Sequence, residues 1–254
     1  MKIGFIGMGN MASAIVRGFI QSKSIDSNQI YGYDICDFNL SNQIQRCQSS
    51  KELVENADVI FFAVKPNVLE SVICEVKDNL KNKAVVSMVA TYPFERLRLL
   101  LDESTRLQVI MPNTPANVQT GVTLFENNGN LHTNEYQFIE NLFQNIGKVV
   151  SLPTYQMNGA TAISGCGPAF VYMFIEAMAD AGVKQGLPRD VAYLLTSQTL
   201  IGAGKMQQET NTHPGVLKDQ VCSPGGLTIK GVTKLEEAGF RNAIIQAVNE
   251  TISK

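Results

Sequence analysis

The chain has 254 residues, of which 44% are hydrophobic and 17% are charged, and its formal net charge is −2. This composition is typical of a globular protein with one or two domains. Acidic and basic residues are mixed along the chain, so the basic stripe that binds a nucleic acid backbone is missing. We find no apolar run as long as a membrane span and no charged leader before the first apolar strand. A cytoplasmic protein without a nucleic acid or membrane partner is therefore expected.

Five cysteines, an odd number, lie far apart in the sequence without a CxxC pair. This spacing argues against a disulfide framework and against a zinc site, so we expect reduced thiols and no bound metal. The two histidines, His132 and His213, have no carboxylate or cysteine at metal-ligand spacing. Both are expected to be structural or surface residues.

Short β-rich runs alternate with helical patterns through the first half of the chain. Nearly continuous apolar strands with helices between them predict a parallel sheet covered on both faces, which is a doubly wound, Rossmann-type α/β domain. We expect this domain to span residues 1–152. Its predicted strands are Lys2–Ile6, Ile30–Tyr33, Val59–Val64, Ala84–Val89, Leu107–Met111 and Lys148–Ser151.

Helical patterns replace the strands after Pro153, and they predict an all-helical second domain over residues 153–254. The run "AFVYMFIEAMADAGV" is apolar around much of its circumference, which is typical of a buried helix. Further helical windows cover Arg189–Gln208 and Gly239–Ile252. These apolar faces are more than a small isolated domain can bury, so we expect a second copy of the chain to cover them.

A glycine motif follows the first predicted strand and opens a helix. In "GFIGMGNMASAIVRGF" the residues Gly7, Gly9 and Ala12 have the spacing GxGxxA. Gly7 permits a tight turn, Gly9 lets a pyrophosphate approach the backbone, and Ala12 allows close packing of the helix on the strand. A plain strand-to-helix turn is the alternative, but the strand, turn, helix and strand order favours dinucleotide binding.

Asp34 ends the second predicted strand, where an acidic residue accepts hydrogen bonds from the adenosine ribose. A carboxylate at this position repels the 2′-phosphate of NADP, so Asp34 favours NADH over NADPH. A solvated aspartate in a loop that also contains Asp37 is the alternative interpretation.

Four long motifs together resemble the pyrroline-5-carboxylate reductase family, and the likeness runs from Met1 to about Glu250. The motifs are "ADVIFFAVKPNVL", "MPNTPA", "ISGCGPAFVYMFIEAMADAGVKQGLPRDVA" and "HPGVLKDQVCSPGGLTIKGV". The resemblance implies reduction of the cyclic imine 1-pyrroline-5-carboxylate to L-proline with NADPH or NADH. It also implies a Rossmann domain followed by a helical domain that interlocks with a second subunit, and thus at least a homodimer.

The resemblance also implies which residues bind the cofactor. Those expected to contact it are Gly7, Met8, Gly9, Asn10, Met11, Asp34, Ala63, Val64, Lys65, Pro66, Ala90 and Asn113. Most of them follow predicted strands, and ligands of open α/β sheets lie at the carboxyl ends of strands. For Lys65 a solvated surface lysine is the alternative. For the "MPNTPA" loop the alternative is that its prolines only stiffen the chain.

The stretch "SPGGLT" places a proline and two glycines inside a helical region. A Pro-Gly-Gly turn that leads into a helix exposes several backbone N–H groups, and such a nest binds a carboxylate without a cationic side chain. A helix that starts after a glycine turn explains the pattern equally well. By resemblance this loop contacts the substrate, and the hydroxyl of Thr228 is the candidate that hydrogen-bonds the ring nitrogen. The expected substrate-binding residues are Ser223, Gly225, Gly226, Leu227 and Thr228.

The chain departs from the family pattern at several positions. Members usually have Ala-Ala-Gly where this chain has Val89, Ala90 and Thr91, an arginine in place of Val109, and a small or hydroxyl residue in place of Leu227. A bulky side chain at Thr91 would hinder close approach of the cofactor. A catalytically weak nucleotide-binding paralogue is therefore an alternative function. A related dehydrogenase of 3-hydroxy acids is a weaker alternative, because that group uses a lysine early in the long helix and residues 158–183 contain none.

Overall fold

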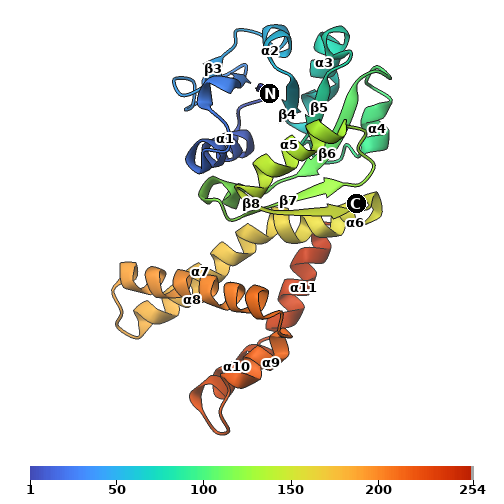
Figure 1. Ribbon diagram of the computed structural model, residues 1–254. Coiled ribbons are helices and arrows are strands. Elements are labelled where there is room, and N and C mark those ends of the chain that lie inside the picture. The colour runs from blue at the N-terminus through green and yellow to red at the C-terminus, as the bar shows by residue number, and fades with distance from the viewer. Residues whose placement is uncertain (253–254) are drawn as a thin grey trace. The chain divides into compact units, whose positions relative to one another are not determined.

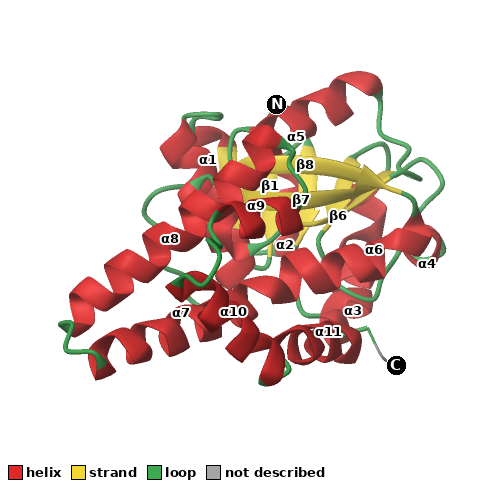
Figure 2. Ribbon diagram, turned by 90° about the horizontal axis from the view of Figure 1, so that it is seen from below, coloured by secondary structure: helices red, strands yellow, loops and turns green. Residues whose placement is uncertain are grey.

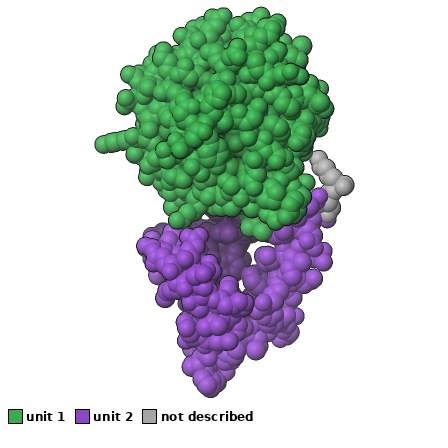
Figure 3. Space-filling model, turned by 45° about the vertical axis from the view of Figure 1, so that its right-hand side comes forward, with its two compact units in different colours: residues 1–165 green, residues 166–254 purple. Residues whose placement is uncertain are grey.

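The computed structural model describes residues 1–252, so residues 253 and 254 of the expected second domain lie outside the described part. The chain divides into two compact units, Met1–Gly165 and Cys166–Lys254, which Figure 3 shows in different colours. The division falls within a helical region, some residues after the strand that ends at Leu152.

Unit 1 is built on one eight-stranded sheet with the strand order β3-β2-β1-β4-β5-β6-β7-β8 (Figure 1). The order 3-2-1-4-5-6 of its first six strands is that of the Rossmann fold, with the reversal next to β1. The strands are β1 (Ile3–Ile6), β2 (Ile30–Tyr33), β3 (Gln45–Arg46), β4 (Val59–Phe62), β5 (Ala84–Ser87), β6 (Arg106–Met111), β7 (Gly121–Glu126) and β8 (Gly147–Leu152).

Two of these strands were not predicted from the sequence. β3 has only two residues, both polar and exposed, so it carries no apolar signal. β7, with the sequence "GVTLFE", pairs antiparallel with β6, and β8 pairs parallel with β7. The predicted parallel sheet is confirmed, and the β6–β7 pair is its antiparallel exception. The connection between them, residues 112–120, contains only the 3-10 helix Thr114–Val118 and no crossover helix of the kind that joins parallel strands.

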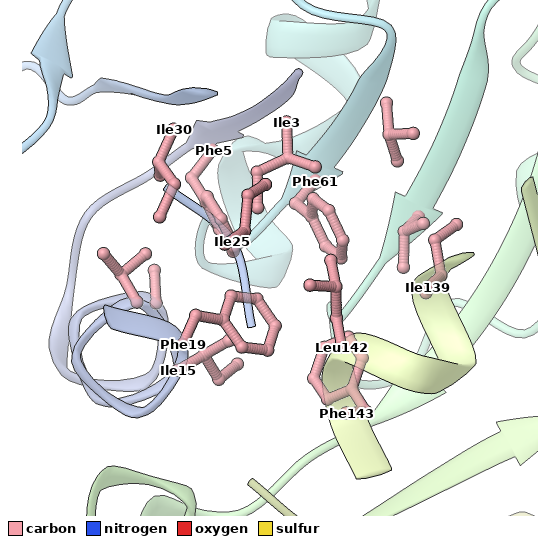
Figure 4. Packing of buried hydrophobic residues seen from close by; sticks show 14 of the residues in the cluster. Ile3, Phe5, Ile15, Phe19, Ile25, Ile30, Phe61, Ile139, Leu142 and Phe143 are labelled. Carbon is pink, nitrogen blue, oxygen red and sulfur yellow. The ribbon is translucent and has the colours of Figure 1, made fainter. Parts of the chain in front are cut away.

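Helices cover both faces of the sheet, as the continuous apolar strands predicted. On one face, α1 (Asn10–Ser22) and α5 (Thr133–Gln144) pack over side chains of β1, β4 and β5. Figure 4 shows Phe19 and Phe143 facing each other there, with ring centroids 5.3 Å apart. On the other face lie α2 (Ser50–Asn56), α3 (Pro66–Val76) and α4 (Phe94–Arg98). Figure 2 distinguishes these helices from the strands by colour.

Unit 2 contains helices and turns but no strand between residues 166 and 252, as expected. Helices α7 and α8 pack against each other, and Phe174 lies 6.1 Å from Phe240 between ring centroids. Many apolar side chains of α7 and α8 remain exposed, among them Met173 at 69% and Leu194 at 68%. The helices are α7 (Gly167–Lys184), α8 (Arg189–Thr210), α9 (Pro214–Gln220), α10 (Leu227–Glu237) and α11 (Phe240–Glu250).

One helical segment within residues 1–252, Thr154–Lys184, is long and apolar enough by length and composition to cross a membrane. The expectation that no apolar run reaches this length is therefore wrong. The segment joins α6 (Thr154–Thr161) and a π-helical turn (Ala162–Cys166) to α7, and the glycines and Pro168 inside it do not break the helix. Only 11% of its most apolar window is buried.

Candidate active site

The expected cofactor residues of unit 1 lie at one edge of the sheet. β2, β1, β4, β5 and β6 are neighbours and parallel, so their carboxyl ends share that edge. Gly7 follows β1, Asp34 follows β2, Ala63 follows β4, Ala90 follows β5 and Asn113 follows β6. This edge is where open α/β sheets bind their ligands, and it contains the topological switch point.

The glycine turn has the geometry that a pyrophosphate site requires. Gly7 has φ +94°, and a Cβ atom there would lie 2.8 Å from the carbonyl carbon of Ala63, so another residue would collide with the end of β4. A Cβ atom on Gly9 would meet nothing within 4 Å. Gly9 and Asn10 are exposed at the amino terminus of α1, which favours anions. The space above Gly9 is therefore open at the amino terminus of α1, as a pyrophosphate site requires.

The carboxylate of Asp34 is fixed beside this turn. Its Oδ2 atom accepts a hydrogen bond of 2.6 Å from the N–H of Met8, and its Oδ1 atom accepts one of 3.0 Å from the N–H of Cys36. The neighbouring cation Arg46 pairs with Asp37 at 2.6 Å. The loop after β2 thus presents a held carboxylate, while Arg46 on β3 is already paired with Asp37.

Residues at the ends of β4 and β5 form the next part of the edge. Lys65 and Pro66 are exposed at the start of α3, and Ala63 and Val64 are half-buried. After β5 the chain turns at Ala90 and Thr91, both exposed.

Thr91 has φ +67°, which is the left-handed conformation that glycine adopts most easily. The backbone at this position thus has the conformation expected of a glycine, although the side chain is β-branched.

The side chain of Asn113 is 6% exposed and makes two protein hydrogen bonds. Its amide nitrogen donates to the carbonyl oxygen of Ser164 at 2.9 Å, and its oxygen accepts from the N–H of Val122 at 2.8 Å. Ser164 lies in the π-helical turn Ala162–Cys166, and such turns occur often at functional sites. Asn113 therefore links the loop after β6 to this turn.

The stretch "SPGGLT" forms a turn at the start of α10 in unit 2. Gly225 has φ +72°, and a Cβ atom on Gly226 would lie 2.4 Å from the Oγ atom of Ser223. Gly226 precedes the first helical residue, and no side chain caps the helix there. The first N–H groups of α10 are therefore free of a side-chain cap, as an anion nest requires.

Two side chains that follow this turn are exposed at the start of α10. Leu227 is 86% exposed at the first position of α10. Thr228 is exposed at the second position, and within residues 1–252 its hydroxyl has no protein hydrogen-bond partner.

Three further positions considered in the sequence have structural roles or lie in the core. His213 accepts a hydrogen bond from the N–H of Gly215 and caps α9, as expected of a structural histidine. Burial raises the pKa of Cys47 to about 11, with a further contribution from Glu52, so its thiol stays protonated. Val109, where the family has arginine, is 1% exposed in the core.

The glycine turn, the amino terminus of α1 and the held carboxylate at the switch point of the sheet define a Rossmann-type dinucleotide-dependent oxidoreductase. Comparison with known sequences narrows this class. A family model described as "Pyrroline-5-carboxylate reductase dimerisation" matches residues 154–254, and one described as "NADP oxidoreductase coenzyme F420-dependent" matches residues 2–91.

Full-length relatives give the same result. Pyrroline-5-carboxylate reductase of Escherichia coli is 39% identical, with 100% of this chain and 96% of that protein covered. The Arabidopsis thaliana enzyme is 38% identical, with 97% and 91% covered. The crystal structure of Plasmodium falciparum pyrroline carboxylate reductase with NADP bound has a TM-score of 0.93 at 32% identity, covering 99% of this chain and 95% of that one. The chain belongs to the pyrroline-5-carboxylate reductase family.

Proposed function

We propose that this chain reduces 1-pyrroline-5-carboxylate to L-proline with a nicotinamide nucleotide, the last step of proline biosynthesis. The full-length match to curated reductases supports the substrate and product. The observation that carries the proposal is the glycine turn, where open space above Gly9 meets the amino terminus of α1.

The reaction adds a hydride to the carbon of the C=N bond and leaves a proton on the nitrogen. A bound nicotinamide supplies the hydride, and the chain has to hold both partners in reacting geometry. If the ring enters as its iminium, the nitrogen already carries the proton and no strong acid is needed. We assign the substrate carboxylate to the N–H groups of Leu227 and Thr228 at the start of α10, with the hydroxyl of Ser223 as a further donor, because the N–H of Gly226 already donates to the carbonyl oxygen of Ser223 at 3.0 Å. The hydroxyl of Thr228 is assigned to the ring nitrogen.

Within the cofactor site, we propose that NADH is preferred over NADPH. In the loop after β2, the carboxylate of Asp34 accepts backbone hydrogen bonds and faces no cation in an ion pair, while Arg46 is engaged by Asp37. A 2′-phosphate would therefore meet a held negative charge. We assign the phosphates to Gly9, Asn10 and Met11 at the start of α1, and the nicotinamide half to the segment from Ala63 to Pro66 and to Ala90. Asn113 is assigned an indirect role, because its side chain is occupied by Val122 and Ser164.

A homodimer is the proposed assembly, with the helical region from residue 153 as its substrate-binding and dimerisation domain. Exposed apolar side chains on α7 and α8 support it, and the matching family model describes dimerisation. The apolar segment Thr154–Lys184 is then covered by a second copy instead of lipid, which agrees with a cytoplasmic location. We expect light scattering at micromolar concentration to give at least twice the chain mass of 27.8 kDa, and a monomer would contradict this assembly.

A weakly catalytic nucleotide-binding protein is the second candidate, and the observation that favours it is the β-branched Thr91 in a glycine-like turn. One assay separates the two. Purified chain is mixed with the imine and with NADH or NADPH, while cofactor absorbance and L-proline are followed together. Cofactor oxidation with stoichiometric proline supports the reductase. Nucleotide binding without proline formation supports the second candidate.

A further inference from the structure

The turn after β5 contains a threonine, Thr91, in a conformation that favours glycine. Thr91 has a left-handed backbone that is unfavourable for a β-branched residue. Ala90 and Thr91 are exposed at the carboxyl edge of the sheet, whereas Val89 and Tyr92 on either side are buried. The turn thus presents its backbone outward while its two flanks are anchored in the core.

Three side chains from two helices and the turn meet at this point. The hydroxyl of Tyr92 donates a hydrogen bond of 2.8 Å to Oε1 of Glu70 on α3. Arg96, on α4, donates to the same carboxylate oxygen at 3.2 Å and to the carbonyl oxygen of Thr91 at 3.5 Å. Its guanidinium lies 3.9 Å from the centroid of the Tyr92 ring. These contacts tie Thr91 and the adjoining Tyr92 to α3 and α4.

A second anchor fixes the chain just beyond the turn. The N–H of Phe94 donates a hydrogen bond of 3.0 Å to Oε2 of Glu126, whose side chain is buried at the end of β7. The start of α4 therefore cannot shift easily, and a change in the turn cannot be absorbed there.

We propose that Glu70, Tyr92 and Arg96 form a positioning cluster that keeps the Thr91 turn left-handed and thereby sets the affinity for the nicotinamide nucleotide. This inference rests on the proposed function, because it places the nucleotide along the edge that includes Ala90. A glycine at position 91 would adopt the left-handed conformation without cost and would need no such cluster. With threonine, the neighbouring contacts have to offset the strain.

The Arg96–Glu70 ion pair of the cluster is too exposed to act mainly on global stability. The side chains of Arg96 and Glu70 are 51% and 55% exposed, and ion pairs as exposed as this one contribute little to stability. Hydrogen bonds from Tyr92 and Arg96 lower the pKa of Glu70, so the carboxylate remains charged at neutral pH. The cluster therefore acts on the local conformation of the turn.

Direct titration of the purified chain with NADH tests the inference without relying on turnover. Tyr92→Phe removes the bond to Glu70 and is expected to raise the Kd for NADH about fivefold, as for one lost hydrogen bond. Arg96→Gln should act in the same direction. Lys81→Ala is the matched control, because it removes an exposed ion pair, with Asp78, before the amino-terminal end of β5. The Kd of this control should equal that of the wild type.

A double-mutant cycle separates positioning from general damage. In the Thr91→Gly background, Tyr92→Phe should raise the Kd less than about twofold, because glycine holds the left-handed turn unaided. An equal rise of the Kd in both backgrounds, or an unchanged Kd for Tyr92→Phe and Arg96→Gln, would refute the positioning role of the cluster. Neither result would contradict the proposed function. Wild-type chain that binds neither NADH nor NADPH would overturn the proposed function, and this inference with it.

Discussion

The Oδ2 atom of Asp34 lies 2.6 Å from the backbone nitrogen of Met8 and accepts its hydrogen bond. This contact ties the end of β2 to the glycine turn that follows β1. The carboxylate is therefore held in place before any cofactor arrives, and it cannot swing away from a phosphate at low cost.

Cofactor preference should follow the charge of Asp34. In Asp34→Ser and Asp34→Asn, the ratio of kcat/KM for NADPH to that for NADH should rise about fivefold or more, since a carboxylate beside the 2′-phosphate costs on the order of 1 kcal/mol. Asp26→Ser is the control, because Asp26 is exposed before the amino-terminal end of β2. Equal or better use of NADPH by the wild type would contradict the preference.

Thr228 should affect the chemical step more than binding. Its hydroxyl has no protein partner within the described residues, so Thr228→Ala should leave the fold intact. We expect kcat to fall roughly tenfold or more, because a lost hydrogen bond to a charged group is worth about 1.5 to 3 kcal/mol. Thr228→Ser should recover much of the rate.

Thr233→Ala is the control for these two variants. It removes a hydroxyl from the same helix, one that donates a hydrogen bond to the carbonyl oxygen of Lys230. An unchanged kcat in Thr228→Ala would show that the hydroxyl has no part in the chemical step. The turn would then bind only the substrate carboxylate. The tight contact between Gly226 and Ser223 makes a bulky substitution at Gly226 a poor test, because it would deform the turn itself.

Asn113 should act through position. Asn113→Asp keeps the shape but places a carboxylate oxygen against the carbonyl of Ser164, where the amide had donated. We expect NADH affinity to fall about tenfold, together with a lower melting temperature. Asn145→Asp is the control, because its exposed amide also donates to a backbone carbonyl, that of Asn141. Equal effects of the two substitutions would refute a special role for Asn113.

The sequence predicted the features that depend on local pattern. Apolar runs placed most strands within a few residues, and the GxGxxA spacing located the turn at Gly7. β7 was missed because two prolines and a glycine around it indicate a loop, while its antiparallel pairing with β6 depends on the neighbouring strand. Long-range partners are not visible in a local pattern.

For the site residues, too, local pattern was visible in the sequence and long-range contacts were not. Thr91 was recognised as a departure from the family, but its positive φ and its contacts to Glu70 and Arg96 need the fold. Asn113 was predicted to bind the cofactor, yet its bonds to Val122 and Ser164 connect segments that are up to 51 residues apart. The signals in the sequence were the family resemblance and an asparagine in a loop between two prolines.

The buried ion pair between Arg106 and Glu135 should make stability depend on pH. Burial raises the pKa of Glu135, but hydrogen bonds from Arg106 and from the N–H of His132 outweigh it, and the net pKa lies below the ordinary value of 4.5. This stabilisation is present above pH 4.5 and is lost as the pH falls through the lowered pKa.

Glu135→Gln should therefore reduce the free energy of unfolding at pH 7 by about 2 kcal/mol and flatten its decline below pH 4.5. Urea unfolding at a fixed protein concentration measures both effects. Glu237→Gln, in an exposed pair with Lys234, should change stability by no more than about 0.5 kcal/mol. An unaltered acid limb in Glu135→Gln would refute the role of this pair.

Hydride transfer from a nicotinamide to the imine carbon of 1-pyrroline-5-carboxylate can be followed with an isotope label. Purified chain is incubated with the imine and with NADH carrying deuterium in the transferable position, and the product is analysed by mass spectrometry. We predict L-proline that is one mass unit heavier, with the deuterium on the ring carbon that was part of the C=N bond. Proline without deuterium, or no proline while the nucleotide remains bound, would contradict the proposed function.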